Sequence, residues 1–203
     1  VLEWIDKNSD YNISSWEIDT LSKRVISWIS NSKISYEDSN ENYKKKFDEM
    51  IKKQINHLIN EIDRSTWVDD KMVGCSAIIL AGISYDDKNF ISYGFKLLRK
   101  IIKVSFDDQG FPKSRNIRQL IFYLKYFILI REWLKESQNE IPEHLNEIIF
   151  YLGQSYVLFH KNIEPNFLFN GNQISKNSNF DNYLKRLGYN FKNGNFEAGG
   201  YIV

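Results

Sequence analysis

Apolar side chains return at helical spacing along most of this chain. Phe47, Ile51, Ile55 and Leu58 recur every three or four residues, which places them on one face of a helix. The pattern predicts main helices over residues 17–30, 41–64, 68–83, 86–104, 115–137 and 142–160, and a short one over 181–187. Strand-like alternation is almost absent. Short connections favour antiparallel neighbours, so the sequence predicts an all-α array of helical hairpins.

Several local signals refine this expectation. Ser14 and Glu17 have the spacing of a capping box, which would start the helix at about residue 17. Gly82 is a plausible helix stop. Cys75 stands among apolar neighbours and is interpreted as a small core residue. The lysine-rich run at residues 44–53 is interpreted as a solvated helix face, in preference to a patch that binds polyanions.

Composition excludes several classes of function. The chain has 203 residues, enough for one domain of ordinary size, and a net charge of +1, which argues against nucleic acid as a main partner. Its single cysteine, Cys75, excludes an internal disulfide and a cysteine-cluster zinc site. The three histidines, His57, His144 and His160, lie far apart, so we expect no metal and no cofactor. The apolar run Leu120–Ile130 contains Lys125 and matches a core helix, so no membrane span is expected.

A donor-rich segment leads into one of the most apolar helices. Asp107-Asp108-Gln109-Gly110 has turn composition, and the polar residues from Lys113 to Gln119 follow it. Lys113, Arg115, Asn116 and Arg118 offer ammonium, guanidinium and amide donors. Such a cluster suits an anionic or hydroxyl-rich ligand.

The two ends of the sequence carry further expectations. The chain begins at Val1 without a methionine, so we expect a processed or excised fragment from which a leader could have been lost. Residues 189–203 are rich in glycine and aromatic residues, and Gly199 to Val203 predicts the start of a β-strand. We therefore assign residues 1–188 to a helical domain and residues 189–203 to a linker or first strand.

Four blocks resemble the heparinase II/III-like family in order and spacing. They are Trp16 to Trp28; Asp107 to Phe111 with Ser114-Arg115-Asn116; Leu168-Phe169-Asn170-Gly171; and Gly199-Gly200-Tyr201. The resemblance implies an incomplete α/α toroid followed by a C-terminal β-sandwich domain, which lies beyond this sequence. It also implies a bacterial protein, periplasmic or cytoplasmic, that acts on an acidic polysaccharide.

The resemblance further implies β-elimination at a uronic acid. A lyase of this kind neutralises the uronate carboxylate, removes the adjacent proton and protonates the leaving oxygen. Asn116 aligns with the family's carboxylate-neutralising asparagine, Arg118 would assist it, and His160 is the candidate for proton transfer. The expected substrate-binding residues are Arg115, Lys113, Asn170 and Asn172.

The chain departs from the family pattern at two points. Phe111, or Ile117 and Arg118 in another alignment, stands where relatives carry histidine, and no tyrosine aligns with the catalytic one. Tyr123, Tyr126 and Tyr156 fall at helix positions typical of core. Two alternatives therefore stay open. One is a non-catalytic glycan-binding or scaffold domain. The other is an α/α-barrel glycoside hydrolase that uses Asp107 and Asp108, although adjacent carboxylates are more often turn or cap residues.

Overall fold

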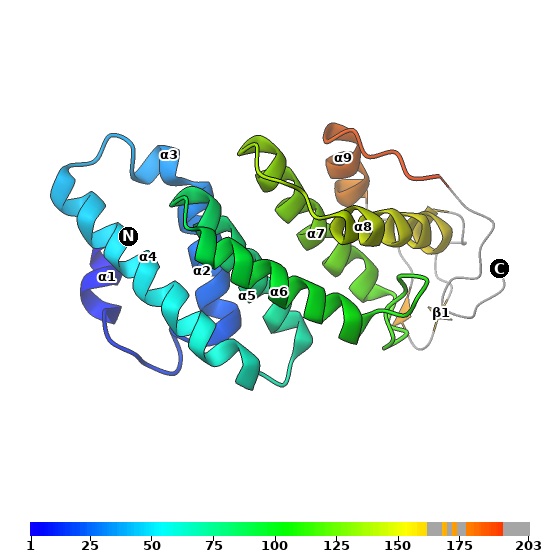
Figure 1. Ribbon diagram of the computed structural model, residues 1–203, viewed down its shortest axis with the longest axis horizontal. Helices are drawn as coiled ribbons and strands as arrows, with labels where there is room; N and C mark the ends of the chain where they lie inside the picture. Colours follow the sequence, from blue (N-terminus) through cyan, green and yellow to red (C-terminus); the bar gives the residue numbers. More distant parts are fainter. Residues whose placement is uncertain (162–167, 170–171, 174–177, 193–203) are drawn as a thin grey trace. The chain divides into compact units, whose positions relative to one another are not determined.

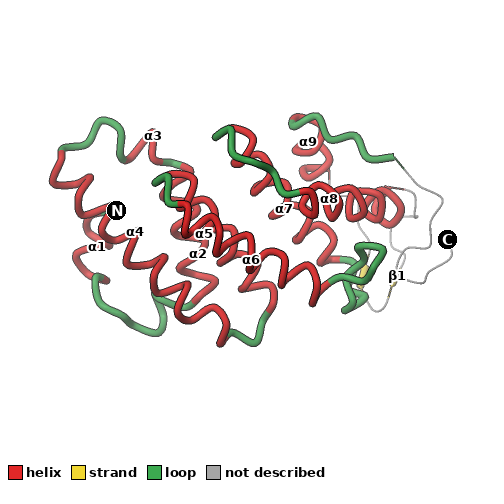
Figure 2. Tube along the Cα trace, viewed as in Figure 1, coloured by secondary structure: helices red, strands yellow, loops and turns green. Residues whose placement is uncertain are grey.

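The computed structural model describes residues 1–161, 168–169, 172–173 and 178–192 (Figure 1). Helices dominate these residues, as Figure 2 shows in red. The chain divides into two compact units, Val1–Ile101 and Ile102–Val203, which are described separately because their relative placement is not determined. The helices of the first unit are α1 (Leu2–Asn8), α2 (Ile18–Ser30), α3 (Ser32–Ser35), α4 (Glu41–Glu61) with a 3₁₀ turn (Ile62–Arg64), α5 (Val68–Ser84) and most of α6 (Lys88–Ser105).

The second unit contains the end of α6 and the rest of the chain. Its elements are α7 (Arg118–Glu136), α8 (Glu143–Tyr156), a π-helical turn (Val157–Lys161), the short antiparallel pair β1 (Leu168–Phe169) and β2 (Asn172–Gln173), and α9 (Ser178–Arg186). All seven predicted helices are present. Helix α7 begins at Arg118 and not at residue 115, because Arg115 has a left-handed backbone with a φ of +57° and Ile117 is the N-cap residue.

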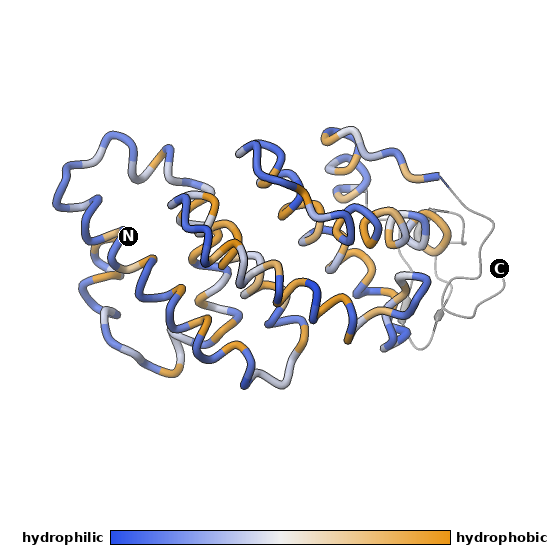
Figure 3. The backbone as a smooth tube through the Cα atoms, in the orientation of Figure 1, coloured by the Kyte–Doolittle hydropathy of each residue, from blue (hydrophilic) through white to orange (hydrophobic). Residues whose placement is uncertain are grey.

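Helix α5 is the core of the first unit. Every residue from Met72 to Gly82 is buried, and its middle is coloured hydrophobic in Figure 3. A helix that is apolar on all sides must be covered on all sides. Helices α2 and α4 pack against it. Cys75 is fully buried in this helix, and its thiol donates to the Gly94 carbonyl over 3.3 Å, so its core role is confirmed.

Helix α4 is amphipathic, as its sequence predicts. Phe47, Ile51, Ile55 and Leu58 are buried, whereas the lysines of residues 44–53 lie on partly or fully exposed positions. Three of these lysines form ion pairs, namely Lys44 with Glu41, Lys46 with Asp6 and Lys53 with Asp10. The interpretation of this run as a solvated helix face is therefore confirmed.

Two local predictions in the first unit are wrong. Ser14 does not cap α2, because its hydroxyl donates to Asn12 Oδ1 and Glu17 takes the N-cap position without a side-chain cap. Gly82 does not stop α5, which continues to Ser84. A Cβ at Gly82 would lie 2.9 Å from the backbone nitrogen of Ile91, so this glycine serves the close approach of α5 and α6.

In the second unit, aromatic rings and a polar cluster fix the helices. The Phe106 ring packs against Tyr123 and Phe127 of α7, with ring centroids 4.9 and 5.8 Å away. Glu132 Oε1 accepts hydrogen bonds from Arg131 Nη1 at 3.0 Å and from the Tyr189 hydroxyl at 2.7 Å. These bonds join the segment after α9 to α7. Burial, together with the bond to Glu132, raises the pKa of Tyr189 and keeps its proton in place.

The close approach at Gly82 gives a test of this packing. We expect Gly82→Ala to destabilise the chain by roughly 1–3 kcal/mol, because overpacking against the Ile91 backbone outweighs the gain of about 1 kcal/mol in helix propensity. Ser92→Ala, at an exposed position of α6, is the matched control and should not destabilise. Urea unfolding of both variants measures the difference, and a Gly82→Ala variant as stable as the parent would contradict this packing.

Candidate functional site

The segment between α6 and α7 is a tight loop organised by one carboxylate. Asp107 Oδ1 accepts hydrogen bonds from the backbone N–H groups of Gln109, at 3.0 Å, and Phe111, at 2.8 Å. The Asp107 N–H donates to the Phe111 carbonyl, and Phe106 and Pro112 form a β-bridge. The predicted turn at Asp107–Gly110 is therefore confirmed, and Asp107 holds it closed.

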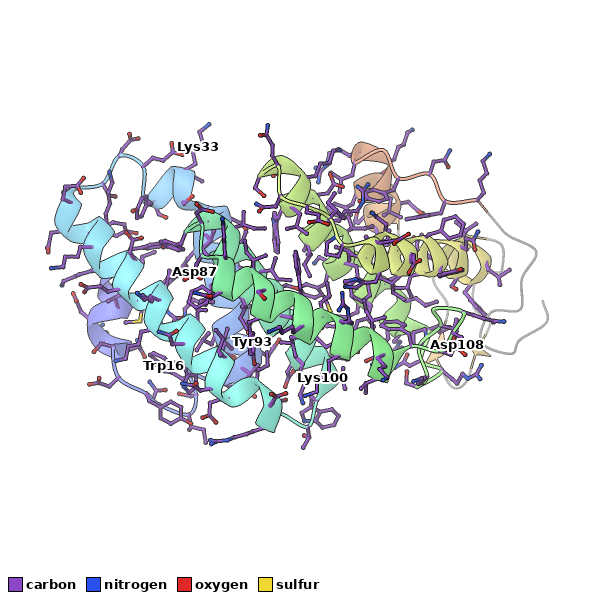
Figure 4. All side chains as sticks on the ribbon, in the orientation of Figure 1. Trp16, Lys33, Asp87, Tyr93, Lys100 and Asp108 are labelled. Atoms are coloured by element: carbon purple, nitrogen blue, oxygen red, sulfur yellow. The ribbon has the colours of Figure 1, made fainter. Side chains whose placement is uncertain are left out.

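This loop packs against helix α8 and the π-helical turn. Gly110 has a φ of +71°, and a Cβ there would lie 2.6 Å from Cβ of Tyr151 on α8. The Phe111 ring is buried against Phe159 of the π-helical turn, with ring centroids 5.4 Å apart. The loop and the turn Val157–Lys161 are therefore neighbours. Figure 4 labels Asp108 on the loop.

The amide of Asn116 has a defined orientation at the start of α7. Its Oδ1 accepts a hydrogen bond from the Arg118 N–H at 3.0 Å. Because the acceptor must be the oxygen, this bond also fixes the direction in which the NH₂ group of the amide points. No described residue accepts a hydrogen bond from that NH₂ group. Asn116 is half-buried, so the amide combines a fixed direction with access from outside.

The basic residues around Asn116 differ in their surroundings. Arg118 is exposed, and its guanidinium makes no ion pair among the described residues. Arg115 is half-buried and has a φ of +57°, a strained backbone for a residue other than glycine. Lys113 Nζ donates a hydrogen bond to the Lys103 carbonyl at 2.9 Å. This carbonyl is in the last turn of α6, where the helix itself provides no donor.

The other predicted site residues are only partly described. The backbone of His160 is in the π-helical turn and that of Asn172 is in β2, but their side chains lie outside the described residues. Asn170 and the tail from 193 to 203, including the predicted strand, lie outside them as well. Tyr123 and Tyr156 are buried as core residues, and the Tyr156 hydroxyl donates to Asp181 Oδ1 at 3.0 Å.

A cleft that the sequence did not predict lies in the first unit. Its volume is about 730 Å³. It is lined by the segment before α2, the end of α4 and the segment before α5, including Tyr11, Trp16, His57, Arg64 and Trp67. Figure 4 labels Trp16. Trp16 and Trp67 each stand next to a helix start in the sequence, but the sequence does not show that residues 11–18 and residues 57–70, which line the cleft, lie together.

Comparison with known proteins gives one structural likeness. No family model and no curated protein matches the sequence. The crystal structure of heparinase III matches with a TM-score of 0.68 over 92% of this chain, at 18% sequence identity. The fold is similar to that of heparinase III. The match spans 32% of the heparinase III chain.

This likeness confirms the predicted fold class, an all-α, incomplete α/α toroid of helical hairpins. At 18% identity it is evidence for the fold alone. Within the described part of the chain, no three His, Cys, Asp or Glu side chains are grouped as metal ligands would be. The helices described there also lack the length and apolar character needed to cross a membrane.

The Asp107 carboxylate gives a test of the loop. Asp107→Ala removes the acceptor of two backbone N–H groups, and we expect a loss of about 1–3 kcal/mol of stability with faster amide exchange at Gln109 and Phe111. Asp107→Asn keeps an acceptor oxygen and should retain most of the protection. Hydrogen exchange followed by NMR measures both effects, and equal protection in all three proteins would rule out the loop geometry described here.

Proposed function

We propose that this chain is the α/α domain of a lyase-like protein that cleaves a uronic-acid-containing polysaccharide by β-elimination. The observation that carries the proposal is the Asn116 amide, whose oxygen accepts a hydrogen bond from the Arg118 N–H while its NH₂ group has no acceptor among the described residues. The likeness in fold to heparinase III supports the same class of protein. The donor group and the fold are independent lines of support.

The chemistry requires stabilisation of a developing charge on the uronate. Removing the proton next to a carboxylate moves negative charge onto the carboxylate oxygens, so a donor directed at them lowers the barrier. In the proposed site the Asn116 NH₂ group donates to one oxygen. Arg118 and Arg115 supply charge-assisted hydrogen bonds or a favourable field.

The start of α7 adds to this field. A helix of 19 residues has a partial positive charge at its N-terminus, which favours a bound anion. The Arg118 and Gln119 N–H groups already donate to Asn116, and that of Leu120 donates to Ile117. The ligand would therefore be recognised by side-chain donors and by the field, and not by direct bonds to these backbone groups.

His160 remains the proposed residue for proton transfer. It directly follows Phe159, whose ring contacts Phe111 of the loop, so its backbone is near the loop that leads to Asn116. It also lies on a π-helical turn, an irregularity that is frequent at functional sites. Asn170 and Asn172 are proposed to contact the substrate, and Lys113 to support the loop. A C-terminal β-sandwich domain is proposed to complete the active site.

The hydrolase alternative is weaker on geometric grounds. Asp107 already accepts two backbone hydrogen bonds that hold the loop closed, so using it as an acid or nucleophile would compete with the fold. Non-catalytic glycan binding remains the second candidate, since the same donors would serve binding alone.

An activity assay separates these candidates. The longest natural polypeptide that contains this sequence is incubated with a panel of uronate polymers, and the absorbance of the unsaturated uronate product is followed. Unsaturated product is expected. New reducing ends without unsaturated product would instead indicate hydrolysis, and binding without cleavage would indicate a glycan-binding domain.

A matched pair of variants tests the role of Asn116. Asn116→Asp keeps an oxygen that can accept from the Arg118 N–H but replaces the donor with a carboxylate, so we expect unchanged stability and an affinity for an acidic oligosaccharide reduced by roughly tenfold or more. Asn42→Asp makes the same charge change at an exposed position of α4 and is the control. Calorimetry at two salt concentrations measures the affinities. Equal affinities of the parent and Asn116→Asp would remove Asn116 from the site, and binding insensitive to salt would argue against charge recognition.

A further inference from the structure

The cleft of the first unit presents aromatic surface to solvent. Trp67 is 72% exposed and Tyr11 is 63% exposed, although both side chains line the cleft. Exposed aromatic rings that gather in one cleft mark a binding site more often than single exposed rings do. Two such rings line this cleft of about 730 Å³, which makes it a candidate binding site.

The walls of this cleft are held rigidly. Trp16 is buried, its indole N–H donates to the Asn8 carbonyl at 3.2 Å, and its ring meets His57 edge to face at 5.2 Å. The Tyr11 ring lies 5.3 Å from His57. Trp67 is the N-cap residue of α5, and its N–H donates to Ser65 Oγ. The rings are therefore presented from fixed backbone, which lowers the entropy lost when a ligand binds.

The charges of the cleft exclude a dense anion. Arg64 forms an ion pair with Glu61 at 2.9 Å, which leaves Glu17 and Asp70 as the lining carboxylates that form no ion pair among the described residues. Burial raises the pKa of Asp70 most, the carboxylates of Asp19, Glu17 and Asp69 raise it further, and Lys23 lowers it. A heavily sulfated ligand would be repelled here, whereas hydroxyl groups can donate to both carboxylates.

We infer that this cleft binds an uncharged sugar unit of an extended saccharide. Trp67 and Tyr11 stack on the apolar faces of the sugar ring, and Glu17 and Asp70 accept hydrogen bonds from its hydroxyl groups. A compact organic cation would also suit aromatic rings and carboxylates. The cleft is wide and open to solvent, however, and Lys53 already places its ammonium over the Trp16 ring at 5.7 Å.

This inference is independent of the proposed elimination chemistry. All of the lining residues belong to the unit Val1–Ile101, and the predicted readout is binding, not cleavage. If the Asn116 site fails its own test, the cleft can still bind sugar, and the reverse also holds.

The experiment is calorimetry on the 203-residue chain with a panel of neutral tetrasaccharides. The panel contains β-1,4-linked glucose, mannose and N-acetylglucosamine and β-1,3-linked glucose, and the comparison ligands are a sulfated heparin tetrasaccharide and tetramethylammonium. At least one neutral tetrasaccharide should bind. Trp67→Ala should weaken that binding about five- to tenfold, since the ring loses its stacking partner.

Two controls separate this cleft from other surfaces. Phe150→Ala removes an aromatic ring of α8 that is 54% exposed, and Asn116→Asp alters the proposed lyase site; neither should change binding of the neutral sugar. Thermal unfolding of each variant checks that it is folded. Three results would each overturn the inference: no neutral tetrasaccharide binding in the millimolar range, binding unaffected by both Trp67→Ala and Tyr11→Ala, or, in the Asn116→Asp variant, preference for the sulfated ligand or for tetramethylammonium.

Discussion

Helix α5 has no face that can be left to water, and the first unit is organised around this constraint. From Met72 to Gly82 all of its residues are buried, so α2 and α4 must cover it. Helices α2 and α4 can cover it because both are amphipathic and bury one apolar face. The cleft is a consequence of this packing. The start of α5, the start of α2 and the end of α4 meet there, and each contributes side chains to the lining.

The second unit depends on a different kind of constraint. Its loop contains few apolar residues, and its shape follows from one carboxylate, one glycine and one buried ring. Asp107 closes the turn, Gly110 permits contact with Tyr151, and Phe111 anchors the loop beside Phe159. These three contacts fix the position of the backbone at Pro112, from which the chain continues to Asn116. The polar residues that follow can remain accessible because the loop is already held by residues before them.

The sequence predicted the helices well because the apolar residues spaced three or four apart are the residues that the helices bury. It predicted the turn at Asp107 for a similar reason, since Asp, Gly and Asn favour turns through local hydrogen bonds. Its errors concern competition between local signals. Helix α1 was not expected, Ser14 bonds to Asn12 instead of capping α2, and Gly82 serves helix packing instead of ending α5. At Ser14 a nearby side chain outweighed a short motif, and at Gly82 a tertiary contact did so.

The two candidate sites show why one could be found from sequence and the other could not. Lys113, Arg115, Asn116 and Arg118 are contiguous, so their composition alone reveals a group of donors. Even there the sequence could not separate their roles. The path of the backbone decides that Lys113 donates to a helix carbonyl and that Asn116 accepts from the Arg118 N–H. Tyr11 shares a cleft with His57 and Trp67 only because helix packing brings residues 11–18 next to residues 57–70. All three residues lie near the ends of helices that pack on one apolar core. The spacing of apolar residues shows which face of a helix is buried, but it does not show which helix ends will meet.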